Sequence, residues 1–197
     1  MKLIIGLTGP TGSGKSTAAK IAESLGFQVI DCDLCAREAV IKDSGGYYAV
    51  ISSFGEDILD ENKEIVRKRL AKKAFSSKAN TELLNRTLFP FIIRIVKEKI
   101  NSEYVLIDAP TLFESGLDSI CNKTVAVLSK QEIRLKRILA RDNISESDAL
   151  LRIGAGKSDE YYLSKADTII YNDGKTEEFS EKFREFLNNC RKENENV

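Results

Sequence analysis

Eight residues near the start of the chain constrain its fold more than any others: Gly9-Pro-Thr-Gly-Ser-Gly14-Lys15-Ser16. They match the pattern Gly-x-x-x-x-Gly-Lys-Ser and lie between an apolar run at residues 2–8 and a helix-forming run. Glycines let such a loop curl so that its backbone N–H groups and the following helix start face an anion. In this pattern the lysine reaches the β- and γ-phosphates of a nucleotide, and the serine hydroxyl binds magnesium. The string predicts a phosphate-binding loop whose nucleotide contacts are Gly9, Thr11, Gly12, Ser13, Gly14, Lys15, Ser16 and Thr17.

Short apolar runs alternate with longer amphipathic stretches along the rest of the chain. The short runs are β-branched or aliphatic and predict buried strands at residues 2–8, 27–30, 103–107, 124–128 and 168–171. Apolar residues three and four apart predict helices at residues 17–25, 65–75, 81–100, 131–141, 147–153 and 177–190. Strands separated by helices imply parallel crossovers, so we expect a three-layer α/β fold with a parallel sheet of about five strands. Ser129 and Ser145 each precede an acidic residue by three positions and are expected to cap helices.

The charge of the chain is balanced overall but uneven along its length. Its 197 residues include 30 Lys plus Arg, 30 Asp plus Glu and no His. Zero net charge argues against a protein that coats nucleic acid, and the lack of histidine excludes His bases, His metal ligands and His triads. Residues 23–61 hold nine acidic and two basic side chains, whereas residues 63–99 hold eleven basic and three acidic ones. The basic segment indicates either a site for an anionic ligand or a solvated helix surface.

The four cysteines and the hydrophobic pattern indicate the cellular compartment of the protein. Cys32, Cys35, Cys121 and Cys190 are too few and too scattered for a disulfide framework. No apolar run has the length of a membrane span, and the first residues do not match a signal peptide. We therefore expect a cytoplasmic protein with reduced thiols and no membrane partner.

The class of nucleotide-binding protein can be narrowed by motifs that the chain lacks. A GTPase needs Asn-Lys-x-Asp to read its base, and the nearest string, Asn122-Lys-Thr-Val125, has no aspartate. The Ser-Gly-Gly-Gln signature of transporter ATPases is absent. At this length, a small-molecule kinase is the remaining common class.

Three aspartates follow predicted strands, at the sheet edge where open α/β folds bind ligands. Asp31 and Asp33 follow the second predicted strand; in a kinase, one could orient the acceptor hydroxyl while the other holds magnesium or its waters. Asp108 ends the third predicted strand and fits a second magnesium-associated carboxylate. Each also has a structural alternative, a helix cap for Asp33 and a turn residue for Asp31 and Asp108.

One predicted helix carries three arginines on a single face. Arg134, Arg137 and Arg141 are three and four residues apart. Their guanidinium groups could close over a transferring phosphate and neutralise its charge. The alternative is an ordinary solvated surface.

Taken together, these residues resemble the dephospho-CoA kinase family. The matches run in order through most of the chain, at residues 7–17, 29–33, 36–37, 54–55, 69, 88, 90, 108–114, 135–137, 141–142, 166–172 and 174. The most particular are the aspartate pair, Asp-Ala-Pro-Thr-Leu-Phe-Glu at 108–114 and Ala-Asp-Thr-Ile-Ile-Tyr-Asn at 166–172.

The resemblance implies that the ATP γ-phosphate is transferred, with Mg²⁺, to the ribose 3′-hydroxyl of dephospho-CoA. It implies one P-loop NTPase domain over residues 1–197, with a helical acceptor-side insertion at about 62–101 and a helical lid at about 130–165. The implied catalytic residues are Asp33, Lys15, Arg137 and Arg141, the implied magnesium ligands are Ser16, Asp31 and Asp108, and Asn172 is an implied nucleotide contact. The implied acceptor contacts are Asp33, Arg37, Asp108, Pro110 and Glu114. ATP and dephospho-CoA would be the partners of a monomer or weak homo-oligomer.

The chain departs from the family pattern at four positions: Phe89, Thr111, Gly156 and Tyr162. Two of them bear most on the acceptor. Phe89 stands where members usually have His, and Gly156 stands where a Gln is usual. Neither residue's side chain can hydrogen-bond a ligand. Two alternatives therefore stay open: a related P-loop kinase with another hydroxyl acceptor, and a non-catalytic ATP-binding module.

Overall fold

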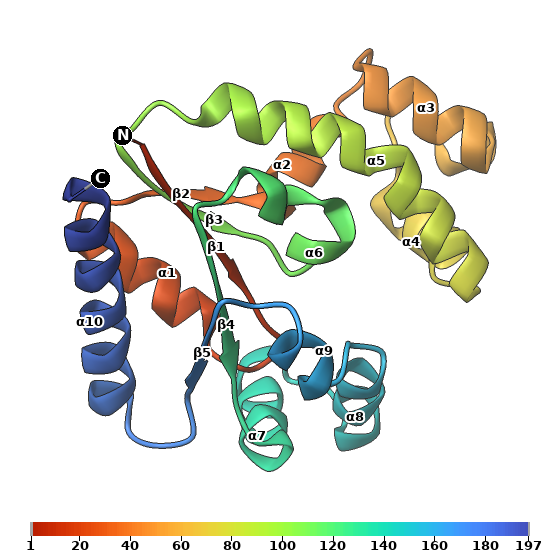
Figure 1. Cartoon of the computed structure of the whole chain (residues 1–197). Coiled ribbons are helices and arrows are strands. Elements are labelled where there is room, and N and C mark those ends of the chain that lie inside the picture. Colours follow the sequence, from red (N-terminus) through yellow and green to blue (C-terminus); the bar gives the residue numbers. More distant parts are fainter. Residues whose placement is uncertain (1, 197) are drawn as a thin grey trace. The chain divides into compact units, whose positions relative to one another are not determined.

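A five-stranded sheet organises the computed structural model, which describes residues 2–196 (Figure 1). The strand order is β2-β3-β1-β4-β5, and β1 pairs in parallel with β3 and β4, as β4 does with β5. The strands are β1 Leu3–Thr8, β2 Gln28–Asp31, β3 Tyr104–Asp108, β4 Lys123–Leu128 and β5 Thr168–Tyr171. Each lies within one residue of its predicted position at either end. The predicted α/β class and its parallel sheet are confirmed.

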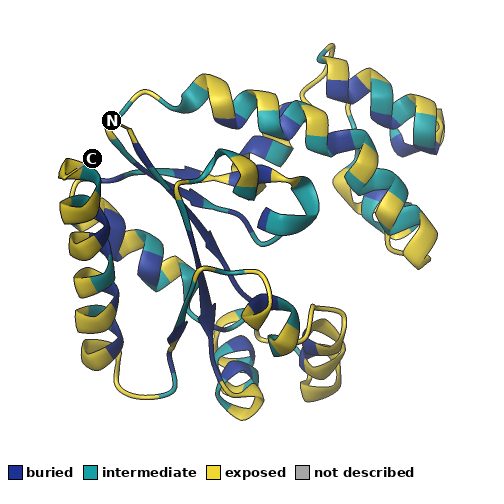
Figure 2. Cartoon of the chain, in the orientation of Figure 1, coloured by how far each residue is buried: buried dark blue, intermediate teal, exposed yellow. Residues whose placement is uncertain are grey.

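One face of the sheet forms the main hydrophobic core with two helices, α1 (Lys15–Ser24) and α10 (Thr176–Glu195). Leu3, Ile5 and Leu7 alternate along β1 and are buried there, because successive side chains of a strand point to opposite faces. Figure 2 shows α10 buried along the side that faces the sheet and exposed along the other. Its buried residues have helical spacing: Phe179, Phe183, Leu187 and Cys190.

The opposite face of the sheet is covered by a second helical layer. A Cβ added to Gly6 of β1 would lie 2.7 Å from the Leu112 side chain, so α6 packs directly on the strand. Tyr162 of α9 is buried against Ala126 and Leu128 of β4. The layer and its neighbours comprise α6 Leu112–Ser115, the 3-10 helix η2 Leu117–Ile120, α7 Gln131–Asp142, α8 Glu146–Gly154 and α9 Asp159–Leu163.

The described residues divide into two compact units. The first comprises the described residues up to Ile30 and from Ser102 onward, and the second comprises Asp31–Asn101. The helices of the second unit are α2 Cys32–Ala39, α3 Gly45–Phe54, the 3-10 helix η1 Glu56–Ile58, α4 Arg67–Ala74 and α5 Lys78–Lys99. This unit contains the residues expected for the insertion, about 62–101, but it begins at Asp31, the last residue of β2. No helix within residues 2–196 is long and apolar enough to cross a membrane.

Candidate active site at the phosphate loop

The loop between β1 and α1 has a tightly curled backbone. Gly9 and Gly14 have φ angles of 139° and 110°, which residues with a Cβ rarely adopt. A Cβ on Gly9 would lie 2.2 Å from the Val127 carbonyl oxygen, and one on Gly14 would lie 2.1 Å from Asn172 Nδ2. The loop thus packs directly on β4 and on the segment after β5. Such a curled backbone before a helix start forms a cradle that fits a phosphate group.

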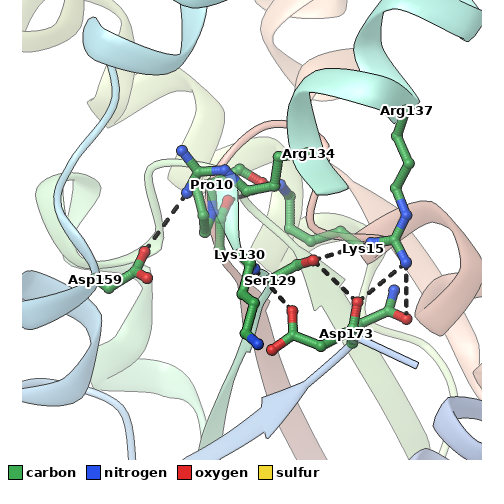
Figure 3. Close-up of polar contacts among 10 residues, drawn as sticks. Pro10, Lys15, Ser129, Lys130, Arg134, Arg137, Asp159 and Asp173 are labelled. Carbon is green, nitrogen blue, oxygen red and sulfur yellow. Dashed lines mark hydrogen bonds and ion pairs between the residues drawn. The ribbon is translucent and has the colours of Figure 1, made fainter. Parts of the chain in front are cut away.

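Lys15 and Ser16 begin α1 directly after the loop. The Lys15 ammonium lies against the loop, with Nζ 2.7 Å from the Gly9 carbonyl oxygen and 3.4 Å from that of Pro10 (Figure 3). These contacts hold a positive charge beside the partial positive charge of the helix N-terminus. Ser16 is exposed in the first helical turn, so its hydroxyl is accessible. The arrangement favours a polyphosphate ligand.

Asp108 ends β3 beside the start of the loop. In the parallel register it lies opposite Leu7, two residues before the loop begins. Two hydrogen bonds fix this edge: Ala109 N–H donates to the Leu7 carbonyl oxygen at 3.0 Å, and the Thr8 hydroxyl donates to the Pro110 carbonyl oxygen at 3.3 Å. The Asp108 carboxylate and the hydroxyl in the first turn of α1 are hard oxygen ligands of the kind that Mg²⁺ takes. The residues present therefore fit a magnesium–nucleotide complex.

Glu114, on α6, lies close to two tyrosines of α9. Burial raises the pKa of Tyr161 to about 12, and Glu114 adds to the rise through its charge and a hydrogen bond. Burial, followed by the Glu114 charge, also raises the pKa of Tyr162 to about 12. Both hydroxyls are therefore protonated at neutral pH, which lets Tyr161 donate to the Glu114 carboxylate.

The three arginines of α7 have three different partners. Arg134 is only 6% exposed, and its Nη1 lies 3.5 Å from Asp159 of α9 (Figure 3). Arg137 donates to backbone carbonyl groups of the phosphate loop. Arg141 is held by the adjacent Asp142 through two hydrogen bonds of 2.6 and 2.9 Å. The three guanidinium groups have different partners within the protein, because side-chain spacing on a helix does not specify what each group meets in the fold. Their closure over a transferring phosphate stays a prediction.

Asn172, directly after β5, is buried and has both ends of its side-chain amide occupied within the protein. Its Nδ2 donates to the Ser13 carbonyl oxygen at 2.8 Å, and its Oδ1 accepts from Arg137 Nη2 at 3.1 Å. The side chain therefore contacts the loop backbone from the protein side. The expected contact between Asn172 and a nucleotide stays a prediction.

Asp31, Asp33 and Arg37 belong to the second unit. Asp31 Oδ1 accepts from the backbone N–H groups of Asp33 at 2.7 Å and Leu34 at 3.1 Å, so Asp31 caps α2. The helix cap that the sequence suggested at Asp33 is therefore made by Asp31, two residues earlier. Asp33 is exposed in the first turn, and the exposed Arg37 follows four residues later on the same helix face. The catalytic, metal-binding and acceptor-binding roles of these residues stay predictions.

Sequence reasoning missed Ser129 as a residue of this site. The cap position of α7 is Lys130, not Ser129, and Lys130 makes no side-chain cap. Ser129 Oγ instead donates to the Asn172 carbonyl oxygen at 2.9 Å. The Ser-x-x-Glu pattern gives no signal for this bond, because the acceptor is 43 residues away in the chain. The cap predicted at Ser145 is confirmed, since its hydroxyl accepts from Asp148 N–H at 3.1 Å.

Comparison with known proteins places the chain in a family. The family model for dephospho-CoA kinase matches residues 3–178. The dephospho-CoA kinase of Fusobacterium nucleatum is 39% identical over 187 residues, which cover 93% of this chain and 96% of that protein. The Arabidopsis thaliana dephospho-CoA kinase is 36% identical over 190 residues, with coverage of 93% and 82%.

Solved structures agree with these matches. The Thermus thermophilus protein TT1252 has a TM-score of 0.79 at 27% identity, with 95% of this chain and 97% of that chain covered. Dephospho-CoA kinase from Campylobacter jejuni has a TM-score of 0.60 at 26% identity, with coverage of 96% and 97%. A shikimate kinase from Bacteroides thetaiotaomicron, at 18% identity, a TM-score of 0.54 and coverage of 94% and 98%, shares the fold alone. With its phosphate loop and a family match through most of its length, the chain belongs to the dephospho-CoA kinase family.

Proposed function

We propose that this chain catalyses the ATP-dependent phosphorylation of dephospho-CoA at its ribose 3′-hydroxyl, which yields coenzyme A and ADP. The observation that carries the proposal is the phosphate loop with the Lys15 ammonium folded onto it. The family match over residues 3–178 includes this loop, the whole second unit and α7 to α9. The donor-side and acceptor-side parts of a kinase therefore both lie within the matched region.

The donor side is built from the loop and the edge of β3. The loop N–H groups and Lys15 would hold the β- and γ-phosphates of ATP. Ser16 and Asp108 would hold Mg²⁺, with Asp31 as a further candidate ligand. The ion supplies charge neutralisation on the phosphate oxygens when it is bound. The Lys15 Nζ lies 2.7 Å from a loop carbonyl oxygen, which keeps the ammonium at the loop.

The phosphoryl transfer asks for positioning and charge more than for covalent chemistry. Asp33 would orient the 3′-hydroxyl and accept its proton as the hydroxyl oxygen attacks the γ-phosphorus. The new O–P bond forms while the bond between the γ-phosphorus and its bridging oxygen breaks, and that oxygen leaves as part of ADP. Arg141, on the segment expected to form the lid, would neutralise charge on the transferring group.

We place the acceptor on the second unit, whose basic segment suits an anionic substrate. Not every cation there is available: Lys73 donates to the Phe54 carbonyl oxygen at 2.7 Å and forms an ion pair with Asp57. Other basic side chains of α4 are exposed: Arg67, Lys68 and Lys72. They provide positive charge for the pyrophosphate group of dephospho-CoA. Arg37, Pro110 and Glu114 remain predicted acceptor contacts.

The test is a coupled assay of ADP release with Mg-ATP and a panel of acceptors. Dephospho-CoA should be turned over, and adenosine, AMP and pantetheine phosphate should be at least about a hundredfold poorer in kcat/KM, as expected when remote binding groups are missing. Activity on another acceptor with none on dephospho-CoA would support a related kinase and reject the proposal. ATP binding without turnover of any acceptor would support a binding module.

A further inference from the structure

We propose that Arg137 and Asn172 are positioning residues that set the shape of the phosphate loop from its protein side. Arg137 Nη1 donates to the carbonyl oxygens of Gly12 at 3.4 Å and Ser13 at 3.2 Å. Asn172 Nδ2 donates to the same Ser13 oxygen at 2.8 Å. Two side chains from different elements therefore converge on one peptide group of the loop. This inference rests on the proposed function, because it assumes that the loop binds phosphate.

That peptide group joins Ser13 to Gly14, and its geometry connects the two sides of the loop. A trans peptide is planar, and its C=O and N–H bonds point in opposite directions. Donors that hold the Ser13 carbonyl toward the protein therefore turn the Gly14 N–H the other way, toward the cradle. Hydrogen bonding also polarises the peptide, which makes its N–H a better donor to an anion. Arg137 and Asn172 thus orient a phosphate-binding group without touching phosphate themselves.

The two side chains are themselves fixed by the ends of β4 and β5. Arg137 Nη2 donates to the carbonyl oxygen and Oδ1 of Asn172, at 3.0 and 3.1 Å. Ser129 Oγ accepts from Arg137 Nη1 at 3.3 Å and donates to the Asn172 carbonyl oxygen at 2.9 Å. Figure 3 shows Arg137 extending from α7 to Ser129. A planar fork of donors is needed to reach all these acceptors at once, and a lysine ammonium cannot replace it.

This role differs from the lid role expected for Arg137. A lid arginine would leave its present contacts to meet the transferring phosphate, whereas a positioning arginine would keep them through the reaction. The packing of Gly14 favours the second role: even a Cβ at Gly14 would lie 2.1 Å from Asn172 Nδ2. The phosphate loop is in contact with the Asn172 amide, and the Arg137 guanidinium donates to both.

The test separates the phosphate part of the nucleotide from its base. Inhibition constants of tripolyphosphate, ADP and adenosine are measured against ATP for the wild type, R137K and N172D. In N172D the carboxylate keeps an acceptor for Arg137 but places oxygen against the Ser13 carbonyl. Both variants should bind tripolyphosphate and ADP about tenfold or more weakly, the usual effect of losing charged or buried hydrogen bonds, and adenosine as before. The KM for ATP should rise more than kcat falls.

R191K is the matched control. Arg191 is also a partly buried arginine that donates to a backbone carbonyl, that of Leu25 at the opposite end of α1, and it lies 4.5 Å from the Phe27 ring and 4.4 Å from the Tyr104 ring. R191K should lower the melting temperature without weakening tripolyphosphate binding. Unchanged tripolyphosphate binding in both R137K and N172D, or a loss confined to adenosine, would overturn the positioning role. A wild type that binds neither tripolyphosphate nor ADP would instead reject the proposed function.

Discussion

At the scale of single residues, Asp31 and Asp33 show how neighbouring carboxylates divide their tasks. Asp31 Oδ1 accepts two backbone N–H groups and holds the start of α2, and one of these donors belongs to Asp33. The cap thereby fixes the backbone of the residue that is proposed to handle the acceptor proton. Asp33 is exposed in the first helical turn, so a substrate can reach its carboxylate.

Replacement of Asp33 by Asn should lower turnover by about a hundredfold or more, the usual size of a general-base contribution, because an amide cannot accept the hydroxyl proton. ATP affinity should stay near the wild-type value. Steady-state kinetics with dephospho-CoA and titration with ATP measure both quantities. The control is E38Q on the same helix, where Glu38 pairs with Lys99 at 2.5 Å on the second unit. Wild-type turnover in D33N would leave Asp33 without a catalytic role.

The residues that sequence could identify are those whose partners are local. Lys15 and Ser16 were found because they are adjacent to the glycines they work with, and Asp108 because it ends an apolar strand. The partners of Arg137 were not predictable, because the helical repeat defines a face but not what the fold brings to it. Asn172 is 35 residues from Arg137 and 159 from Ser13. Contacts of that kind exist only once the strands have been ordered.

At the scale of elements, the strands were predictable and α3 was not. Buried parallel strands have continuous apolar runs, which the sequence displays directly. Residues 45–54 begin with two glycines and contain β-branched and aromatic residues, all poor helix formers. A local cap and packing on α5 support the helix instead: Ser44 accepts from Tyr47 N–H at 3.1 Å, and a Cβ at Gly45 would lie 2.7 Å from Phe91 Cε1. With α2 and α3, the second unit extends from Asp31, well before the residues expected for the insertion.

The packing of α3 on the end of α2 depends on Gly46. A Cβ there would lie 2.2 Å from the Ala39 carbonyl oxygen and 3.4 Å from Phe91 Cγ. Gly46→Ala should therefore destabilise the protein by about 1–3 kcal/mol through overpacking. Gly154→Ala is the matched change, because Gly154 ends α8 and a Cβ there meets nothing within 4 Å. It should stabilise by up to about 1 kcal/mol through helix propensity.

Urea unfolding of the two glycine variants measures the difference in free energy. The wild type and both variants should give similar m-values, since neither change alters the surface exposed on unfolding. Equal midpoints for G46A and G154A would show that the contact with the Ala39 carbonyl does not constrain the second unit.

At the scale of the whole molecule, the lack of histidine shapes the response to pH. No side chain has an ordinary pKa between 6 and 8, so stability should be nearly constant across that range. On the acid side, a hydrogen bond from Lys73 lowers the pKa of Asp57, and one from Arg141, with the Arg152 charge, lowers the pKa of Asp142. A lowered folded-state pKa gives stability that is present above the ordinary carboxylate pKa of about 4 and is lost as the pH falls below it.

On the alkaline side, several tyrosines and cysteines have raised pKa values, among them the buried Tyr162 and the half-buried Cys121. Burial raises the pKa of Tyr162 from 10.0 to about 12, with a smaller effect from Glu114, and burial raises the pKa of Cys121 from 9.0 to about 12. Between the ordinary and the raised pKa of each group, the unfolded chain has released a proton that the folded chain keeps. The free energy of unfolding therefore falls as the pH rises above about 9.

The melting temperature, measured from pH 3 to 11, should be nearly constant in the middle of this range and fall at both ends. Y162F and C121A should each reduce the alkaline slope, because each variant removes one group whose proton is held by folding. The acid limb should not change in either variant. An alkaline slope equal to the wild type in both variants would contradict the assignment of that loss to side chains that folding keeps protonated.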